Sequence, residues 1–411
     1  MNLEKLDFDV IIVGAGPSGS SLAAFLSKQN KKVLIVDKST FPRDKVCGEC
    51  ISPGALNILD ELGIKSELDK LNIEKTRGVT FKAPNQKAAK IYYPNNKYGY
   101  AISRRKLDKL VLDIANSNSN VTSIESFNLK SISVEKEQVI ITGIKNNVEQ
   151  NFTAKMLVGA DGRYSSVAKI LNMYDLQDKH SRSVYVATFE GIKDLDDTIN
   201  LEVQSNKLQY LISKQSEGLT SVAVVINQQE EHQKINKESF INMVKKANTL
   251  NDKFTNLTFE SQLKGIKLQS YKLKSLVSDR VMFVGDAVGF IDPITGEGMY
   301  RAFKTAKLAS EIIEKAFAKN KFLKNDLMEY QKILLKEFSA IYTFIKTAVF
   351  LTTSENLINT LIGNIDSARE LVEKLVSLQG ALIPGKELFS LDTLKLSLNI
   401  LKSPNLFNES Y

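Results

Sequence analysis

Short, fully apolar runs alternate along this chain with longer stretches in which apolar residues recur every three or four positions. Val10–Val13 and Lys32–Val36 contain the first two runs, and a glycine-rich turn with an apolar-striped segment lies between them. A run that is apolar throughout is typical of a strand buried on both faces, as in a parallel sheet. The pattern therefore predicts a strand, a tight turn, a helix and a second parallel strand.

The glycine turn has the spacing that binds a dinucleotide. Gly14 allows the tight turn, Gly16 lets the backbone approach a pyrophosphate, and Gly19 lets the helix pack against the strand. Asp37 ends the second run and can accept hydrogen bonds from ribose hydroxyls. The phosphates would lie at a helix N-terminus, where unpaired N–H groups favour anions. Candidate contacts beside these residues are Pro17, Ser18 and Lys38. Glycine turns are common without a ligand, but the two apolar flanks favour the dinucleotide interpretation.

Further along the chain, the periodicity predicts a second kind of sheet. Helical spacing marks Pro53–Leu62 and Arg105–Asn116, whereas residues 176–265 read mainly as alternating strands with one helix near 237–247. A buried strand returns at 280–284, followed by a helix over 298–318 and a largely helical remainder. The predicted fold is α/β (α+β overall). A Rossmann-like domain covers 1–75, 101–175 and 266–330, an antiparallel-sheet substrate domain covers 76–100 and 176–265, and a helical region covers 331–411.

Two more motifs place acids and glycines at strand ends. Asp161 and Gly162 follow a buried strand, where a carboxylate and a close backbone approach would face a ligand. Alone, this pair could equally be an ordinary Asp-Gly turn. Asp286 ends the later strand and could bind a ribityl hydroxyl. The glycine-rich segment that follows would open a helix whose N–H groups face the cofactor, through Gly296, Gly298 and Met299.

Together, the three motifs resemble those of the flavoprotein superfamily that contains aromatic-ring hydroxylases, flavin halogenases and geranylgeranyl reductases. The resemblance covers about residues 5–330, and the segments Phe41–Glu49 and Ile51–Ala55 are similar to the geranylgeranyl reductase branch. It implies FAD as cofactor, lined by Arg43, Cys47 and Gly48, with Arg104 as a further contact. Because the chain has a single glycine motif, the reductant would be a transiently bound NAD(P)H or a ferredoxin.

The reaction of a protein in this superfamily depends on which substrate reacts with the reduced flavin: oxygen, halide or an alkene. The chain has no tryptophan, which removes the Trp-x-Trp-x-Ile-Pro motif of the halogenases. In the sheet domain, the reductase family's aromatic pattern is replaced near Leu208–Ser213, where Tyr210 is the candidate for part of its cavity role. By resemblance, Cys47 lies beside the flavin ring and is a candidate catalytic residue; the alternative is a small residue packed there.

Cys47 and Cys50 also form a Cys-x-x-Cys pair, which is found in redox disulfides and metal sites. A metal needs more ligands, and the only histidines, His180 and His232, lie in the sheet domain without paired spacing. We therefore predict no metal site. The net charge of +8 makes an anionic membrane surface a candidate partner, and no nucleic-acid module stands out.

The predicted location is cytoplasmic, peripheral to the inner face of the membrane, because no secretory signal or long apolar run is found. The segment 340–351 is apolar on most faces and is either core or a membrane-facing lid. Three hypotheses follow: a flavin reductase acting on C=C bonds of a prenyl lipid, a monooxygenase acting on a hydrophobic or aromatic metabolite, and a non-catalytic protein that binds flavin and lipid.

Overall fold

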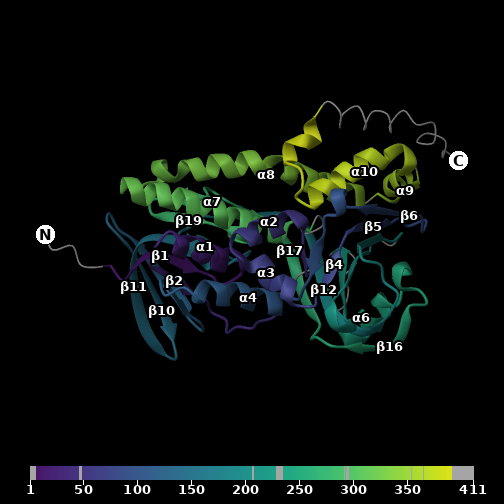
Figure 1. Ribbon diagram of the computed structural model, residues 1–411, viewed down its shortest axis with the longest axis horizontal. Coiled ribbons are helices and arrows are strands. Elements are labelled where there is room, and N and C mark those ends of the chain that lie inside the picture. The colour runs from purple at the N-terminus through teal and green to yellow at the C-terminus, as the bar shows by residue number, and fades with distance from the viewer. Residues whose placement is uncertain are drawn as a thin grey trace.

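The first layer of the fold is a mixed sheet built around the N-terminal strand (Figure 1). The computed structural model describes residues 6–45, 49–205, 208–227, 235–290, 292, 296–352, 354–363 and 365–390. The strand order is β18-β19-β11-β1-β2-β8, with a β9–β10 hairpin joined to β11. These strands are β1 (Phe8–Val13), β2 (Val33–Val36), β8 (Val121–Ile124), β9 (Asn128–Val134), β10 (Val139–Lys145), β11 (Val148–Gly159), β18 (Val277–Ser278) and β19 (Val281–Phe283).

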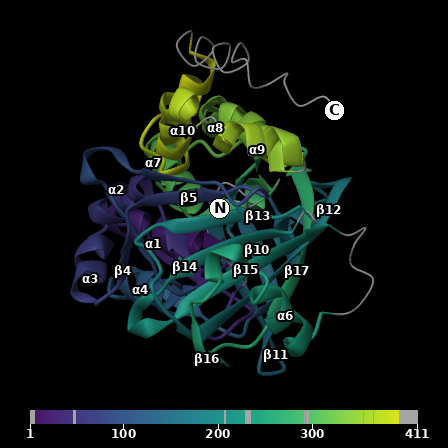
Figure 2. The same cartoon turned by 90° about the vertical axis from the view of Figure 1, so that its right-hand side faces the viewer.

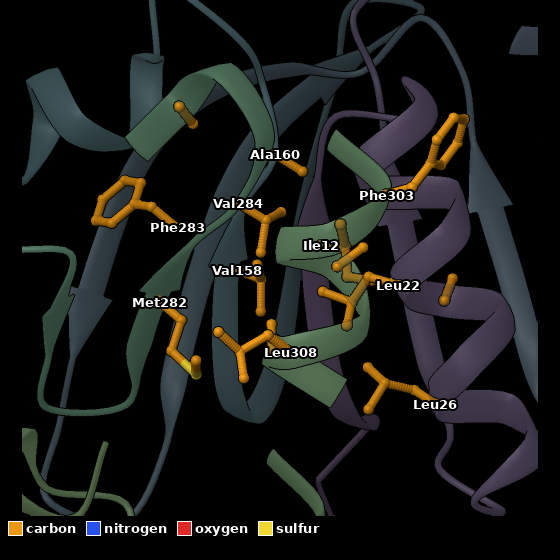
Figure 3. Close-up of a cluster of buried hydrophobic side chains, with 14 of the residues drawn as sticks. Ile12, Leu22, Leu26, Val158, Ala160, Met282, Phe283, Val284, Phe303 and Leu308 are labelled. Atoms are coloured by element: carbon orange, nitrogen blue, oxygen red, sulfur yellow. The ribbon is translucent and has the colours of Figure 1, made fainter. Parts of the chain in front are cut away.

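Helices cover this sheet and bury its apolar strands. In Figure 3, Ile12 of β1 lies next to Leu22 of α1 (Pro17–Lys28), and Phe303 of α7 (Gly298–Lys319) belongs to the same cluster. All three side chains are inaccessible to solvent. The remaining helices around the sheet are α2 (Pro53–Glu61), α3 (Ile64–Lys70), α4 (Arg104–Asn116) and α5 (Ser166–Ile170). This shared core fixes the carboxyl ends of β1, β11 and β19 beside the first turns of α1 and α7.

The second layer is a largely antiparallel sheet in the order β20-β17-β12-β15-β14-β13-β5-β6, with β16 paired to β12. Its members are β5 (Gly78–Lys82), β6 (Ala88–Tyr92), β12 (Tyr174–Ile192), β13 (Ile199–Val203), β14 (Gln209–Lys214), β15 (Thr220–Asn227), β16 (Phe254–Phe259), β17 (Lys264–Leu273) and β20 (Gly289–Phe290). One face packs on α6 (Lys237–Val244) around Phe189 and Phe240. Figure 2 looks onto this sheet, with α6 below it and the C-terminal helices above.

The C-terminal helices pack against both layers. α8 (Lys324–Thr352) lies along α7, and α9 (Glu355–Gly363) and α10 (Ile365–Gln379) cover the β5–β6 end of the second sheet (Figure 1). Val372 and Val376 of α10 pack on Val79 and Ile91 of that sheet. A small sheet of β3 (Cys50–Ile51), β7 (Gly99–Ala101) and β4 (Glu74–Thr76) lies nearby. None of the helices among the described residues is both long enough and apolar enough to span a bilayer.

The predicted fold class is confirmed: an α/β layer, an interrupting antiparallel sheet and a helical C-terminal region are all present. Two details differ. The buried strand expected before Asp161 is the second half of a longer strand, β11, whose first half pairs antiparallel with β10 and whose second half pairs parallel with β1. The antiparallel sheet also extends past its expected limits, because β12 begins at Tyr174 and β17 continues to Leu273 in register with it.

Candidate active site

The glycine turn after β1 forms one end of a deep cavity. Gly14 has a φ of +110°, and a Cβ at this position would lie 2.6 Å from the carbonyl carbon of Ala160 and 2.8 Å from the amide nitrogen of Asp161. Gly14 therefore brings β1 against the end of β11. Gly16 is the N-cap of α1, and no described side chain caps that helix. The first-turn N–H groups of α1 are thus left to bind an anion.

Asp37 holds the other side of this turn. Its Oδ2 accepts a hydrogen bond from the Ala15 N–H at 2.8 Å, and its Oδ1 accepts one from the Ser39 N–H at 2.8 Å. The carboxylate is 8% exposed and lines the cavity. Each oxygen keeps a further acceptor site, so the geometry can receive two hydroxyl donors from one ribose.

Two arginines share one buried carboxylate beside the turn. Arg104 donates to both oxygens of Asp108, from Nε at 2.7 Å and from Nη2 at 2.9 Å, and Nη2 of Arg43 lies 3.8 Å from Asp108. Two cations on one anion leave an excess positive charge in the cavity wall. Nε of Arg43 is buried and has no hydrogen-bond partner among the described residues. This part of the wall can therefore bind a diphosphate.

Asp161 and Gly162 occupy the end of β11. Oδ2 of Asp161 accepts hydrogen bonds from the Ser166 N–H at 2.6 Å and the Val167 N–H at 3.1 Å. Its Oδ1 is buried without a partner among the described residues. Burial raises the pKa of this carboxyl above its usual value. A ligand hydroxyl donating to Oδ1 would satisfy that acceptor, because buried polar atoms are normally hydrogen-bonded.

Asp286 forms an ion pair with Arg301 on α7. Burial alone would raise the pKa of Asp286, but the positive charges of Arg301, Lys45 and Arg163 outweigh it and hold that pKa below its usual value. The Tyr271 hydroxyl donates to the backbone carbonyl of Asp286. The turn that carries Asp286 is therefore fixed from α7 and from the second sheet.

One continuous cavity of about 460 Å³ connects these groups. Gly296, Gly298 and Met299, which open α7, line it together with the glycine turn, Asp37, Lys38, Arg43, Arg104, Asp161, Gly162 and Asp286. The cavity continues to the second sheet, where its wall is apolar. That part is lined by Val184, Val186, Leu211, Ala223, Val225, Ile266, Leu268 and Phe290.

The comparison with protein families identifies the cofactor of this cavity. A model of the FAD binding domain family matches residues 7–318, three-quarters of the chain. The chain belongs to this FAD-binding family. The suspected FAD-dependent superfamily and the predicted cofactor are thereby confirmed, and the protein is an FAD-dependent oxidoreductase.

Two relatives with different named activities and one solved structure are similar to this chain. The chain is 25% identical to a 1H-pyrrole-2-carbonyl-(peptidyl-carrier protein) chlorinase of Pseudomonas fluorescens, covering 95% of this chain and 92% of the relative. It is 25% identical to a digeranylgeranylglycerophospholipid reductase of Thermoplasma acidophilum, covering 80% and 84%. Among solved structures, a flavoprotein/dehydrogenase from Cytophaga hutchinsonii matches with a TM-score of 0.81 at 19% identity, covering 95% and 96%. The last match shows a shared fold.

The residues of this cavity fit FAD. Its walls combine the uncapped start of α1, an excess of positive charge near Arg43 and the buried Oδ1 of Asp161 that lacks a partner. These groups match the anionic and hydroxyl-bearing parts of the cofactor, and the start of α7 lines the same cavity.

Sequence reasoning missed two charged residues in the flavin-family segment 41–49. Lys45 lines the cavity, and burial, reinforced by Arg104, lowers the pKa of its ammonium group to about 8. Glu49 also lines it with a φ of +56°, and burial raises the pKa of its carboxyl to about 7. Both residues lie inside the segment 41–49 that resembles the geranylgeranyl reductases, and this position could have predicted them as cofactor contacts.

Arg301 was missed because no sequence pattern links it to Asp286, fifteen residues away.

The roles predicted for the two candidate catalytic residues, Cys47 and Tyr210, both stay predictions. Cys47 lies outside the described residues, as does Gly48, so their predicted roles stay predictions; Cys50 lines the cavity. The Tyr210 side chain packs on the α6 face of β14, and its hydroxyl donates to the Met243 carbonyl at 3.2 Å. Tyr210 lines the cavity together with its neighbours Gln209 and Leu211, so its predicted cavity role stays a prediction.

Proposed function

We propose that the protein reduces carbon–carbon double bonds of a prenyl lipid with hydride supplied by reduced FAD. The observation that carries this proposal is the apolar chamber that continues the cofactor cavity along β12, β14, β15 and β17. An elongated hydrocarbon can bury its surface there, at about 25 cal/mol per Å². The similarity to the Thermoplasma acidophilum reductase supports the same substrate class.

In this proposal, the chain's own residues divide the work of holding the cofactor. Asp37 binds the adenosine ribose, and the start of α1 with Arg43 and Arg104 binds the diphosphate. Asp161 and Asp286 accept hydrogen bonds from the ribityl hydroxyls, while Gly296, Gly298 and Met299 at the start of α7 face the flavin ring. The chamber walls exclude water and place the lipid chain against that ring.

The reductant and the membrane are further parts of the proposal. NAD(P)H bound transiently, or a ferredoxin, supplies the electrons, since the chain has a single glycine motif for a dinucleotide. The net charge of +8 favours contact with an anionic membrane surface, from which a prenyl lipid would be taken.

Anaerobic reoxidation tests the reaction directly. Holoprotein is reduced with dithionite in the absence of oxygen and mixed with a geranylgeranyl lipid in micelles. We expect the absorbance of oxidised flavin to return and the lipid to gain the mass of two hydrogens per reduced bond. No reoxidation by any prenyl lipid would overturn the proposal.

A second candidate is an oxygen-dependent monooxygenase, favoured by the similarity to the chlorinase across 95% of the chain. It predicts NAD(P)H oxidation that consumes oxygen and accelerates when a hydrophobic metabolite is added. The chain contains no tryptophan for the halogenase motif, so halide should leave the rate unchanged.

A further inference from the structure

A buried polar cluster interrupts the apolar wall of the chamber. Arg182 lies on β12 and Gln209 on β14, and both project from the sheet face that also carries Val184 and Leu211. Arg182 is 5% exposed and Gln209 is 7% exposed. Nε of Arg182 donates to Asp292 at 3.1 Å, and Nη1 donates to Oε1 of Gln209 at 2.9 Å. The cluster joins the second sheet to the segment between β20 and α7.

Arg182 determines how the Gln209 amide is oriented. A guanidinium group has only donors, so the atom that faces it must be the carbonyl oxygen of the glutamine. The NH₂ group of Gln209 therefore points away from Arg182. Within the part of the chain that the structure describes, no atom accepts a hydrogen bond from this Nε2, and Gln209 lines the cavity.

The charge of the cluster limits what Gln209 can recognise. Asp292 forms an ion pair with Arg182, with both side chains at most 7% exposed, so the pair presents no net charge to the chamber. Of this cluster, Gln209 and Asp292 line the chamber, and Gln209 supplies a neutral N–H donor there. Such a donor favours a neutral acceptor oxygen, because a bound anion would be desolvated without a compensating positive charge.

We propose that Gln209 is a specificity-determining residue that donates a hydrogen bond to an ester, ether or carbonyl oxygen on a mostly hydrocarbon substrate. This inference rests on the proposed function in one respect, that the chamber is where the substrate binds. Arg182 and Asp292 act as positioning residues that hold the amide with its NH₂ group toward the substrate.

Two saturated isoprenoids test the inference without any turnover. Methyl phytanate carries an ester, and phytane is the corresponding hydrocarbon; neither has a carbon–carbon double bond to reduce. Their affinities for holoprotein are measured in the same micelles from the quenching of bound-flavin fluorescence. Gln209→Glu keeps an acceptor for Arg182 but removes the donor, and Gln209→Leu removes both. Gln215→Leu is the control, since Gln215 is buried in the same region but bonds to Ser213 and does not line the cavity.

We expect the ratio of ester to hydrocarbon affinity to fall about tenfold in Gln209→Glu and in Gln209→Leu, the value of one neutral hydrogen bond, and to stay unchanged in Gln215→Leu. An unchanged ratio in Gln209→Glu would overturn the inference. If the ratio falls as expected but no prenyl lipid reoxidises the flavin, the inferred role of Gln209 stands and the proposed reaction fails.

Discussion

The two ends of the cavity are built on opposite principles. The cofactor end combines backbone N–H groups, glycines and charged side chains such as Arg43 and Asp286 at the carboxyl ends of parallel strands. The chamber end is a sheet face of mostly apolar side chains, with Gln209 and the ion pair of Arg182 and Asp292 as its polar cluster. The first end therefore sets the cofactor through local geometry, whereas the second sets the substrate through side chains contributed by distant strands.

The largest expected effect is at the glycine turn. In Gly14→Ala, the new Cβ meets the backbone of Ala160 and Asp161 at 2.6–2.8 Å, and the φ of +110° adds strain. Because backbone atoms cannot move aside cheaply, we expect a loss of more than about 4 kcal/mol in the free energy of unfolding. The flavin retained per protein after purification should fall to near zero.

Gly63→Ala is the matched control for that change. Gly63 also has a positive φ, of +76°, but a Cβ there has no atom within 4 Å. The left-handed conformation alone costs about 1–2 kcal/mol, and flavin content should stay normal. Equal destabilisation by the two substitutions would show that conformation rather than contact with β11 limits position 14.

The second-largest effect is expected when the ion pair of Asp286 and Arg301 is broken. Arg301→Met leaves the carboxylate of Asp286 without its main partner and should cost about 3 kcal/mol of unfolding free energy. The double variant Asp286→Asn with Arg301→Met should recover part of that loss, since no unpaired charge is then left at this pair. Chemical denaturation of the apoprotein measures both. A double variant less stable than Arg301→Met would contradict the pairing.

The sequence predicted more of the residues at the cofactor end of the cavity than at the chamber end. Gly14, Asp37 and Asp161 were predicted because each follows directly on an apolar strand, and the carboxyl ends of parallel strands meet at one edge. Arg301 and Gln209 could not be predicted, because their partners Asp286 and Arg182 come close only once α7 and the second sheet have packed. The sequence pattern predicts functional residues at the ends of single strands, but it does not predict contacts between distant elements.

Lys45 gives the cofactor end a pH dependence. Its ammonium group has a pKa lowered to about 8 by burial, and the diphosphate of FAD would favour the charged form. FAD binding should therefore take up a proton, and affinity should fall by up to about tenfold per pH unit above pH 8. In Lys45→Met this slope should disappear. Equilibrium titration of apoprotein with FAD at several pH values measures it.

The stability of the apoprotein changes with pH in the opposite direction to the affinity for FAD. A lysine whose folded-state pKa is depressed contributes stability that is present above pH 10.5 and is lost as the pH falls through about 8. Lys45→Met should therefore stabilise the apoprotein relative to wild type at pH 7 and lose this advantage at high pH. A difference that does not change with pH would contradict the lowered pKa.

The smallest expected effect concerns Tyr210, and it tests which face of β14 binds substrate. Successive residues of a strand point to opposite faces, so a substrate contact made by Tyr210 instead of Gln209 would lie on the other face of β14. Tyr210→Phe removes one hydrogen bond to the Met243 carbonyl and should cost about 1 kcal/mol of unfolding free energy. Its ratio of methyl phytanate to phytane affinity should match wild type, because the ring packs against α6. A variant with normal stability and an altered ratio would instead place Tyr210 in the chamber wall.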